Sequence, residues 1–210
     1  MSEAKGMIRT MRKKSQIKIA QAAILIAVLV VFDQITKILA QAALKGKDAF
    51  ILIPEVFELR YLENTSAAFG KDPVSVLNQI FHFSYFVEHP EALLAWKMGF
   101  FALFTIAAVV IIVLIDLKIP DNRRFLWIDV VLQLFIAGAI GNFIDRMGRH
   151  YVIDFFYFSL IDFPIFNVAD IYVTVGAVLL IVLVLFYYKE EDFEAVFPSK
   201  NKVNKDSDRN

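Results

Sequence analysis

Four long apolar runs, separated by shorter polar segments, dominate this chain. The runs lie at about residues 19–44, 92–115, 125–144 and 166–188. Each is close to the ~20 residues that an α-helix needs to cross the hydrocarbon core of a bilayer. The pattern therefore predicts a membrane protein that is mainly α, with four transmembrane helices.

The segment between the first two runs predicts a different kind of structure. Residues 45–70 hold short apolar stretches, β-branched and aromatic side chains and Pro54, which together favour strands. Residues 71–91 are polar and aromatic, and they fit a loop or a short amphipathic helix in the plane of the membrane interface. We therefore expect residues 45–91 to form a small β-cradle and a helical lid outside the membrane.

Basic residues give the chain a direction across the membrane. They cluster before the first run and after the second and fourth runs: Lys5, Arg9, Arg12, Lys13, Lys14, Lys18, Lys118, Arg123, Arg124 and Lys189. The positive-inside rule places these residues and both termini in the cytoplasm, and it places residues 45–91 and 145–165 on the outer side. Residues 1–190 then form one membrane-embedded domain, and the charged segment 191–210 predicts a disordered cytoplasmic tail.

The first run also has one feature of a secretory signal peptide, because Ala40-Gln41-Ala42 resembles a cleavage site. We favour an uncleaved membrane helix. The apolar run is longer than a signal core, and Asp33 and Lys37 interrupt it before that site.

Composition narrows the chemistry that the chain can perform. Hydrophobic residues make up 58% of the 210 positions, which argues against a soluble chain, and the formal net charge of zero gives no sign of nucleic-acid binding. The absence of cysteine excludes a thiol nucleophile, a thiolate metal site and a disulfide framework. The three histidines lack the spacing of a zinc hydrolase. We therefore expect no metal and no cofactor, and chemistry by carboxylates, hydroxyls, lysines or amides.

Polar residues concentrate between Gly138 and Asp170, at the edges of two apolar runs. They are four aspartates, two asparagines and two arginines: Asp145, Asp154, Asp162, Asp170, Asn142, Asn167, Arg146 and Arg149. Asn142 and Asp145 share one face of the third helix, and Asn167 and Asp170 share one face of the fourth. Antiparallel neighbouring helices bring the two faces to the same depth. Ionisable groups at such a depth are costly and are retained mostly for function.

Asp154 lies on the loop predicted between these two helices. Two carboxylates held close together in a low dielectric do not both ionise readily, so they titrate as a pair. In aspartic proteases the ionised member takes a proton from water and the protonated member donates to the scissile carbonyl. Spacing alone leaves open which aspartates form the pair. It also fits a proton-coupled transporter or a scaffold protein without chemistry.

Several of the polar residues also have purely structural interpretations. Asn167 sits where a helix N-cap is expected. Asp145 and Arg146 can form an ion pair of neighbours, and Asp33 and Lys37 have the i, i+4 spacing of a structural pair on one helix. Asp129 and Gln133 can form hydrogen bonds between helices.

Four sequence blocks, in order along the chain, resemble the lipoprotein signal peptidases (signal peptidase II) of bacteria. The blocks are Phe32–Lys37, Asn64–Gly70, Gly141–Arg146 with Val152–Phe155, and Phe166–Asp170 with Gly176. Ser66 stands where the family usually has glycine, which implies an altered or slightly strained turn after Asn64. The lid segment is also longer than the family implies.

The resemblance implies an intramembrane aspartic endopeptidase that removes the signal peptide from diacylglyceryl-modified prolipoproteins, cutting just before the lipidated cysteine. By motif, the catalytic pair is Asp154 and Asp170, while Asp162 is the aspartate most easily mistaken for a member of it. The resemblance assigns the remaining motif residues to substrate binding or support of the site: Asn64, Asn142, Asp145, Arg146, Asn167, Asp33 and Lys37.

The resemblance also implies a location and partners. The protein is expected in the bacterial cytoplasmic membrane, with its active site at the extracytoplasmic face. Its partners are expected to be lipidated prolipoproteins and membrane lipids, and we expect it to act as a monomer.

Overall fold

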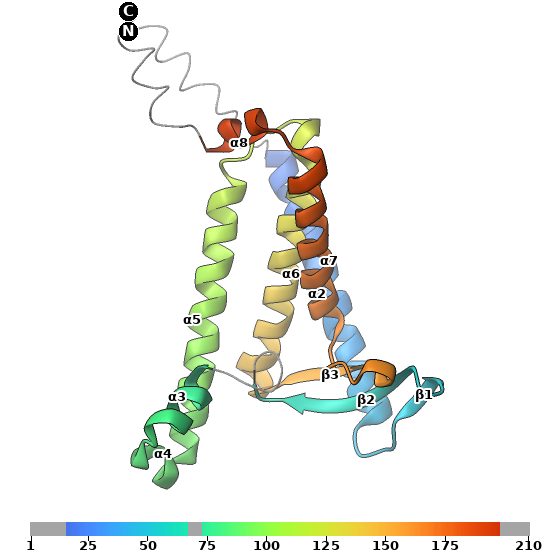
Figure 1. Ribbon diagram of the computed structural model, residues 1–210, viewed down its shortest axis with the longest axis vertical. Coiled ribbons are helices and arrows are strands. Elements are labelled where there is room, and N and C mark those ends of the chain that lie inside the picture. The colour runs from blue at the N-terminus through green and yellow to red at the C-terminus, as the bar shows by residue number, and fades with distance from the viewer. Residues whose placement is uncertain (1–15, 67–72, 198–210) are drawn as a thin grey trace, which may run out of the picture.

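Four long helices form the body of the protein in the computed structural model, which describes residues 16–66 and 73–197. They run side by side, with a small sheet at one end (Figure 1). The helices are α2 (Gln16–Leu44), α5 (Pro90–Asp116), α6 (Leu126–Arg149) and α7 (Val168–Val182), and a π-helical turn η4 (Leu183–Tyr187) continues α7. Each of the four is long and apolar enough to cross a membrane, which confirms the prediction of four spans.

Two helix boundaries differ from the prediction. The third apolar run ends at residue 144, but α6 continues to Arg149 because Asp145 and Arg149 form an i, i+4 ion pair along it. The fourth run begins at residue 166, but α7 begins at Val168 because Asn167 is its N-cap. A 3-10 turn η2 (Arg123–Phe125) leads into α6.

Three antiparallel strands form the sheet, in the order β1-β2-β3. Strands β1 (Phe50–Ile53) and β2 (Phe57–Asn64) confirm the strands expected in residues 45–70. Strand β3 (Val152–Tyr157) corrects the prediction that Asp154 lies on a loop. It pairs with β2, and in this register Leu62 lies opposite Asp154.

Two short helices follow β2 in the chain, as the lid segment predicts. They are α3 (Pro73–Phe81) and α4 (Ser84–Glu88), and both pack against α5 beside the sheet end of the molecule (Figure 1). The first two residues of the predicted lid lie outside the described residues. A second short turn, η3 (Ser159–Ile161), follows β3.

The chain after α7 is helical where the structure describes it, contrary to the prediction of a disordered tail from residue 191. Helix α8 (Glu190–Val196) carries Asp192, which accepts a hydrogen bond of 2.7 Å from Arg124 in the loop before α6. The Arg124 guanidinium also lies 4.2 Å from the centre of the Tyr187 ring. Residues 198–210 of the predicted tail lie outside the described residues.

The molecule buries several polar side chains beside its apolar core, while much of its helical surface is apolar. Long apolar side chains such as Leu103, Val178 and Phe186 are more than half exposed. The buried polar or charged residues are Asp33, Lys37, Asp129, Asp145, Asp154 and Asn167. An apolar helical surface of this kind fits a chain whose outer surface contacts lipid.

The core lies at the sheet end of the bundle, where α2, α6, α7 and β3 meet. Its buried apolar residues are Ala40, Leu44, Ala137, Ile153, Phe155, Val168 and Tyr172. Helices α6 and α7 approach closely at Gly138, where a Cβ atom would lie 2.6 Å from the carbonyl oxygen of Ala169. This approach brings the end of α6 against the start of α7.

Candidate active site

The start of α7 is fixed by its own first residues. The backbone N–H of Asp170 donates to Asn167 Oδ1 at 3.1 Å, and the backbone N–H of Asn167 donates to Asp170 Oδ2 at 3.1 Å. This reciprocal arrangement is a capping box, which satisfies backbone donors that a helix start leaves unpaired. The structure thus confirms Asn167 as an N-cap, and it gives Asp170 a defined orientation.

Strand β3 carries Asp154 to the same place. Asp154 is only 2% exposed. Its Oδ2 accepts a hydrogen bond of 2.9 Å from the side-chain amide of Asn64, at the end of β2. Its Oδ1 accepts one of 2.6 Å from the side-chain amide of Asn167. The sheet therefore positions one aspartate and the start of α7 positions the other.

Asn142 connects the two aspartates. Its Nδ2 donates to Asp170 Oδ1 at 2.8 Å, and its Oδ1 accepts from Asn167 Nδ2 at 3.1 Å. Asp154 and Asp170 are therefore linked through the side chains of Asn167 and Asn142. The two polar helix faces meet at one depth, as the spacing predicts.

A buried ion cluster lies beneath this network. Lys37 is fully buried, and its ammonium lies 2.9 Å from Asp33 Oδ2, 3.0 Å from Asp145 Oδ2 and 3.0 Å from Asn142 Oδ1. The predicted pair of Asp33 and Lys37 is confirmed. Asp145 pairs with Lys37 and Arg149 and not with Arg146, because neighbours on a helix point apart. Buried charges persist only when they are paired in this way.

Asp33 also joins α2 to α7. Its Oδ1 accepts a hydrogen bond of 2.9 Å from the backbone N–H of Ala169, in the first turn of α7. A Cβ atom at Gly141 would lie 2.6 Å from Asp33 Oδ2, so only glycine leaves room for this carboxylate. The cluster is therefore part of the helix packing that holds the aspartates.

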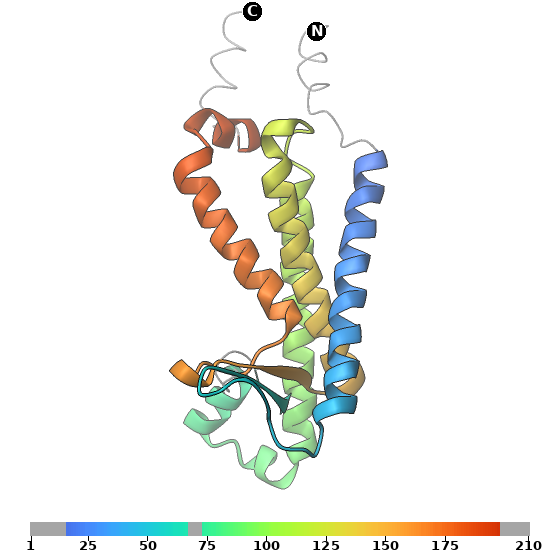
Figure 2. The same cartoon turned by 90° about the vertical axis from the view of Figure 1, so that its right-hand side faces the viewer.

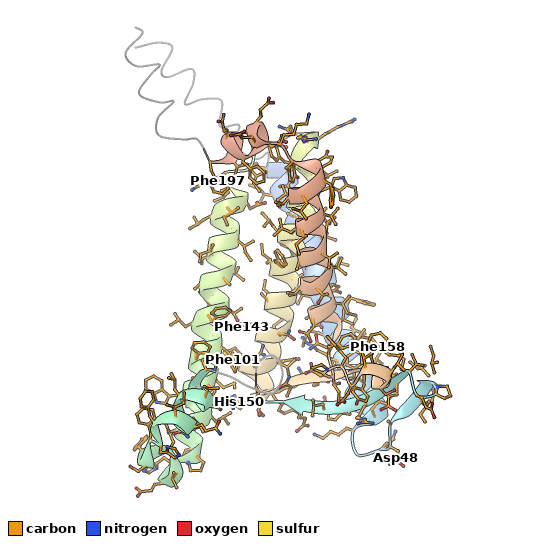
Figure 3. All side chains as sticks on the ribbon, in the orientation of Figure 1. Asp48, Phe101, Phe143, His150, Phe158 and Phe197 are labelled. Atoms are coloured by element: carbon orange, nitrogen blue, oxygen red, sulfur yellow. The ribbon has the colours of Figure 1, made fainter. Side chains whose placement is uncertain are left out.

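Arg146 lies at the edge of the site with weak contacts. Its guanidinium donates to the carbonyl oxygens of Asn142 and Ser66, each at 3.4 Å, and lies 4.5 Å from the centre of the Phe101 ring. Figure 3 shows Phe101 and Phe143 just above the sheet, on the side of α5 and α6. Contacts of this length leave the planar fork able to bind a further acceptor.

The turn after Asn64 is ordinary at Ser66. The backbone N–H of Ser66 donates to Asn64 Oδ1 at 2.9 Å. Ser66 is absent from the described residues that have a positive φ, so the expected strain is not found there. The hydrogen bond needs only the backbone of residue 66, which explains why serine can replace glycine.

Asp162 is not part of the carboxylate pair. It lies after η3 in an exposed, left-handed turn with φ of 48° and accepts a hydrogen bond from the hydroxyl of Tyr157. Its carboxylate therefore has a different partner from that of Asp154, although both aspartates follow an isoleucine and precede a phenylalanine.

Burial changes the proton affinity of Asp154. Loss of hydration, followed by the negative charge of Asp170, raises the pKa of Asp154 to about 7, against the opposing effect of the amide donors of Asn64 and Asn167. A carboxyl with this pKa can hold or release a proton near neutral pH. A carboxyl of this kind linked to a second carboxylate is the arrangement that acid–base hydrolysis uses.

Two further residues of the site, Gln34 and Arg149, receive no role in the sequence analysis. Gln34 donates to the carbonyl oxygen of Gly141 at 3.1 Å and so fastens α2 to α6. Arg149 is the second partner of Asp145. The i, i+4 spacing could have shown the role of Arg149, whereas nothing local marks the partner of Gln34.

The residues that the structure describes hold no group of three or more His, Cys, Asp or Glu side chains that could bind a metal ion. Four spanning helices with two linked aspartates at one end define the class as a multi-pass membrane protein with a paired-carboxylate site. The family model described as signal peptidase (SPase) II matches residues 25–186. The chain belongs to the signal peptidase II family.

Individual relatives and solved structures agree with this assignment. The lipoprotein signal peptidase of Staphylococcus aureus strain JH9 is 36% identical over 165 residues, which cover 77% of this chain and 86% of the relative, and that of strain Newman gives the same values. A bacterial membrane enzyme structure determined by the in meso method at 2.3 Å resolution has a TM-score of 0.64 and 31% identity, covering 85% of this chain and 96% of that one. A second such structure, at 1.9 Å resolution, has a TM-score of 0.63 and 31% identity, covering 84% and 98%. The protein is therefore a peptidase that acts on prolipoproteins, and the transporter interpretation is not supported.

Proposed function

We propose that Asp154 and Asp170 are the catalytic pair of this peptidase, and that it cleaves diacylglyceryl-modified prolipoproteins just before the lipidated cysteine. The observation that carries the proposal is the link from Asp154 through Asn167 and Asn142 to Asp170.

The surroundings of the two aspartates differ and suggest different roles. Asp170 lies in the first turn of α7, where the helix dipole and the donors of Asn142 and Asn167 stabilise a negative charge. Asp154 is more deeply buried, and its raised pKa of about 7 retains a proton. We assign Asp170 as the general base and Asp154 as the general acid.

The reaction then proceeds without a covalent intermediate. Asp170 takes a proton from a water molecule, whose oxygen attacks the scissile carbonyl carbon, while Asp154 gives its proton to the carbonyl oxygen. When the C–N bond of the tetrahedral intermediate breaks, the proton on Asp170 passes to the leaving nitrogen. The hydroxyl proton returns to Asp154 and restores the starting state.

Arg146 is suited to hold the substrate backbone. Its fork makes only 3.4 Å contacts to the carbonyl oxygens of Asn142 and Ser66. A peptide or ester carbonyl of the substrate offers a stronger acceptor at the same position. Arg146 thus binds substrate beside the pair, on the side of α5.

The site lies at the extracytoplasmic face in this proposal. The first described residues of α2 and the whole of α8 lie at the opposite end of the bundle from the sheet (Figure 2). An ion pair of Lys18 and Asp121 joins α2 to the loop before α6 at that end. The described members of the basic set predicted to be cytoplasmic belong to the elements at this end, and this supports a cytoplasmic location for it: Lys18, Lys118, Arg123, Arg124 and Lys189.

The sheet offers a surface for lipid. All four side chains of β1 are exposed and apolar, with Phe50 at 58% and Ile51 at 59%. A strand of this kind is unfavourable in water and favourable at a bilayer surface. The diacylglyceryl group of the substrate can then stay in the bilayer while the peptide reaches the pair. Both aspartates and all their described donors come from one chain, which supports a monomer.

Cleavage of a lipidated prolipoprotein by the purified, detergent-solubilised enzyme tests the proposal. Asp154→Asn and Asp170→Asn are each expected to lower kcat by at least about 1,000-fold, because each removes an acid–base group. Asp162→Asn is the matched control, since it makes the same change on an aspartate outside the pair. A near wild-type rate in either pair variant, or an equal loss in Asp162→Asn, refutes the assignment. Cleavage of unlipidated precursor at the same rate refutes the substrate class.

A further inference from the structure

Three asparagine side chains surround the two aspartates, and each has a donor end and an acceptor end. A side-chain amide offers hydrogen through Nδ2 and accepts through Oδ1. All three turn Nδ2 toward a carboxylate: Asn64 and Asn167 toward Asp154, and Asn142 toward Asp170. If one of these amides were turned by 180°, its Oδ1 would face a carboxylate oxygen, and the hydrogen bond would be lost.

Backbone donors fix two of these amides. The N–H of Ser66 donates to Asn64 Oδ1, and the N–H of Asp170 donates to Asn167 Oδ1. A backbone N–H cannot accept a hydrogen bond, so the oxygen must face it. The Nδ2 of both amides is thereby directed to Asp154.

Asn142 receives no such backbone donor among the contacts of its side chain. Its oxygen instead accepts from the ammonium of Lys37 at 3.0 Å and from Asn167 Nδ2 at 3.1 Å. An ammonium has three donors and no acceptor. If the Asn142 amide turned over, its nitrogen would face two donors and its oxygen would face Asp170.

We propose that Lys37 is a positioning residue for catalysis, whose buried ammonium fixes the Asn142 amide so that it donates to Asp170. The proposal rests on the function assigned to Asp154 and Asp170 above. It gives Lys37 a role distinct from its ion pairs with Asp33 and Asp145, which hold the helices together.

The fixed amides also decide where the proton of the pair can point. Every amide contact to Asp154 and Asp170 in the described structure is a donor, so none of them can accept a carboxyl proton. The proton on the pair is therefore directed away from the protein donors, toward the substrate. A turned Asn142 would accept that proton and remove it from the reaction.

The charges around the pair determine how the proposal can be tested. The charged or titratable groups that face it from α2, α6, α7 and β3 are Asp33, Lys37, Asp145, Arg146, Arg149, Asp154 and Asp170. Removing Lys37 alone would leave Asp33 without its cationic partner in a fully buried place. Lys37→Met combined with Asp33→Asn removes one charge of each sign and keeps the balance.

The test compares this double variant with Asp33→Asn alone, in which Lys37 still donates to Asn142. We measure kcat/KM for a lipidated prolipoprotein across pH, together with thermal unfolding. In the double variant the acid limb, where the base takes up a proton, is expected to lie at higher pH than in Asp33→Asn, because the Asn142 amide is no longer held with its donor toward Asp170. In Asp33→Asn the acid limb is expected to stay in place or move to lower pH.

The outcomes separate this proposal from the function on which it rests. If the acid limb of kcat/KM lies at the same pH in the two variants, the positioning role of Lys37 is overturned, even if both variants unfold at lower temperature than wild type. Activity in Asp154→Asn or Asp170→Asn overturns the function itself.

If the double variant does not fold, NMR spectroscopy of isotope-labelled wild-type protein tests the proposed hydrogen bond from Asn142 to Asp170. The side-chain amide signal of Asn142, assigned by its loss in Asn142→Ser, is expected to exchange slowly with water and to shift across the acid limb. A signal that does not respond to pH across that limb overturns the proposal.

Discussion

Replacing Gly138 by alanine tests the packing that brings the two halves of the site together. A Cβ atom at this position would lie 2.6 Å from the carbonyl oxygen of Ala169 and 2.7 Å from a methyl group of Val173. The first distance is about 0.8 Å short of the 3.4 Å at which ordinary contact begins. The neighbour is backbone, so α7 itself must move away from α6.

The expected change in the unfolding free energy of Gly138→Ala results from two opposing effects. Overpacking a close contact costs about 1–3 kcal/mol, while exchanging glycine for alanine inside a helix contributes about 1 kcal/mol of stability. Gly99→Ala is the matched control, because Gly99 lies inside α5 with nothing within 4 Å of the added Cβ. The helix term is common to both variants, so their difference in unfolding free energy measures the clash, at about 1–3 kcal/mol.

Gly138→Ala should lower the cleavage rate more strongly than it lowers the stability of the fold. Asp170 follows Ala169 directly, so moving the start of α7 moves one aspartate relative to the other. A misplacement of about 1 Å can cost about 100-fold in rate, and we expect kcat to fall by roughly 10- to 100-fold in Gly138→Ala. The assays are thermal unfolding in detergent and the rate of prolipoprotein cleavage. If Gly138→Ala matches Gly99→Ala in both assays, the close approach of α6 and α7 does not hold the site.

Three further predictions concern pH, the turn after β2 and the far end of the bundle. The pKa of Asp154 is raised to about 7, and its protonated form is the general acid, so kcat/KM is expected to fall as pH rises through about 7. A kcat/KM that stays constant from pH 6 to 8 contradicts this role. Ser66→Gly should keep its cleavage activity within about twofold of wild type, whereas Ser66→Pro should lose about 10-fold or more, because proline removes the N–H that orients Asn64. Equal cleavage rates in the two variants would show that this N–H does not orient Asn64. Arg124→Met should lower the unfolding temperature only slightly relative to Arg123→Met and leave the cleavage rate unchanged, since Arg124 is partly exposed and lies at the end of the bundle opposite the sheet (Figure 1). A loss of activity in Arg124→Met would link α8 to the site.

The parts of the fold that depend on local sequence could be predicted. The four spans follow from hydropathy, which each segment displays by itself, and the structure has all four. Asn167 as an N-cap and Asp33 with Lys37 follow from spacings of three or four residues. The positions of Asn142 and Asp170 at one depth follow from the antiparallel order of two helices.

The parts that depend on distant partners could not be predicted. Strand β3 is apolar on both sides of Asp154, so it shows no alternation, and the strand it pairs with is 90 residues earlier at Asn64. The sequence predicts a disordered tail where helix α8 forms, because Arg124, which binds Asp192 of this helix, is 68 positions away. The contact of Lys37 with Asn142 spans 105 positions and leaves no trace in spacing.

The hydrogen bond between Asp33 and the N–H of Ala169 joins the first described helix to the last spanning helix, across 136 positions of sequence. A ribosome-bound chain that has inserted α2 must therefore wait for α7 before this contact can form. The first turn of α7 carries Asp170, so the same contact that completes the fold also delivers the second carboxylate. A chain interrupted during biogenesis holds one aspartate at most in working order. The membrane is thereby protected from a partly assembled protease, because proteolytic competence arrives only with the final helix.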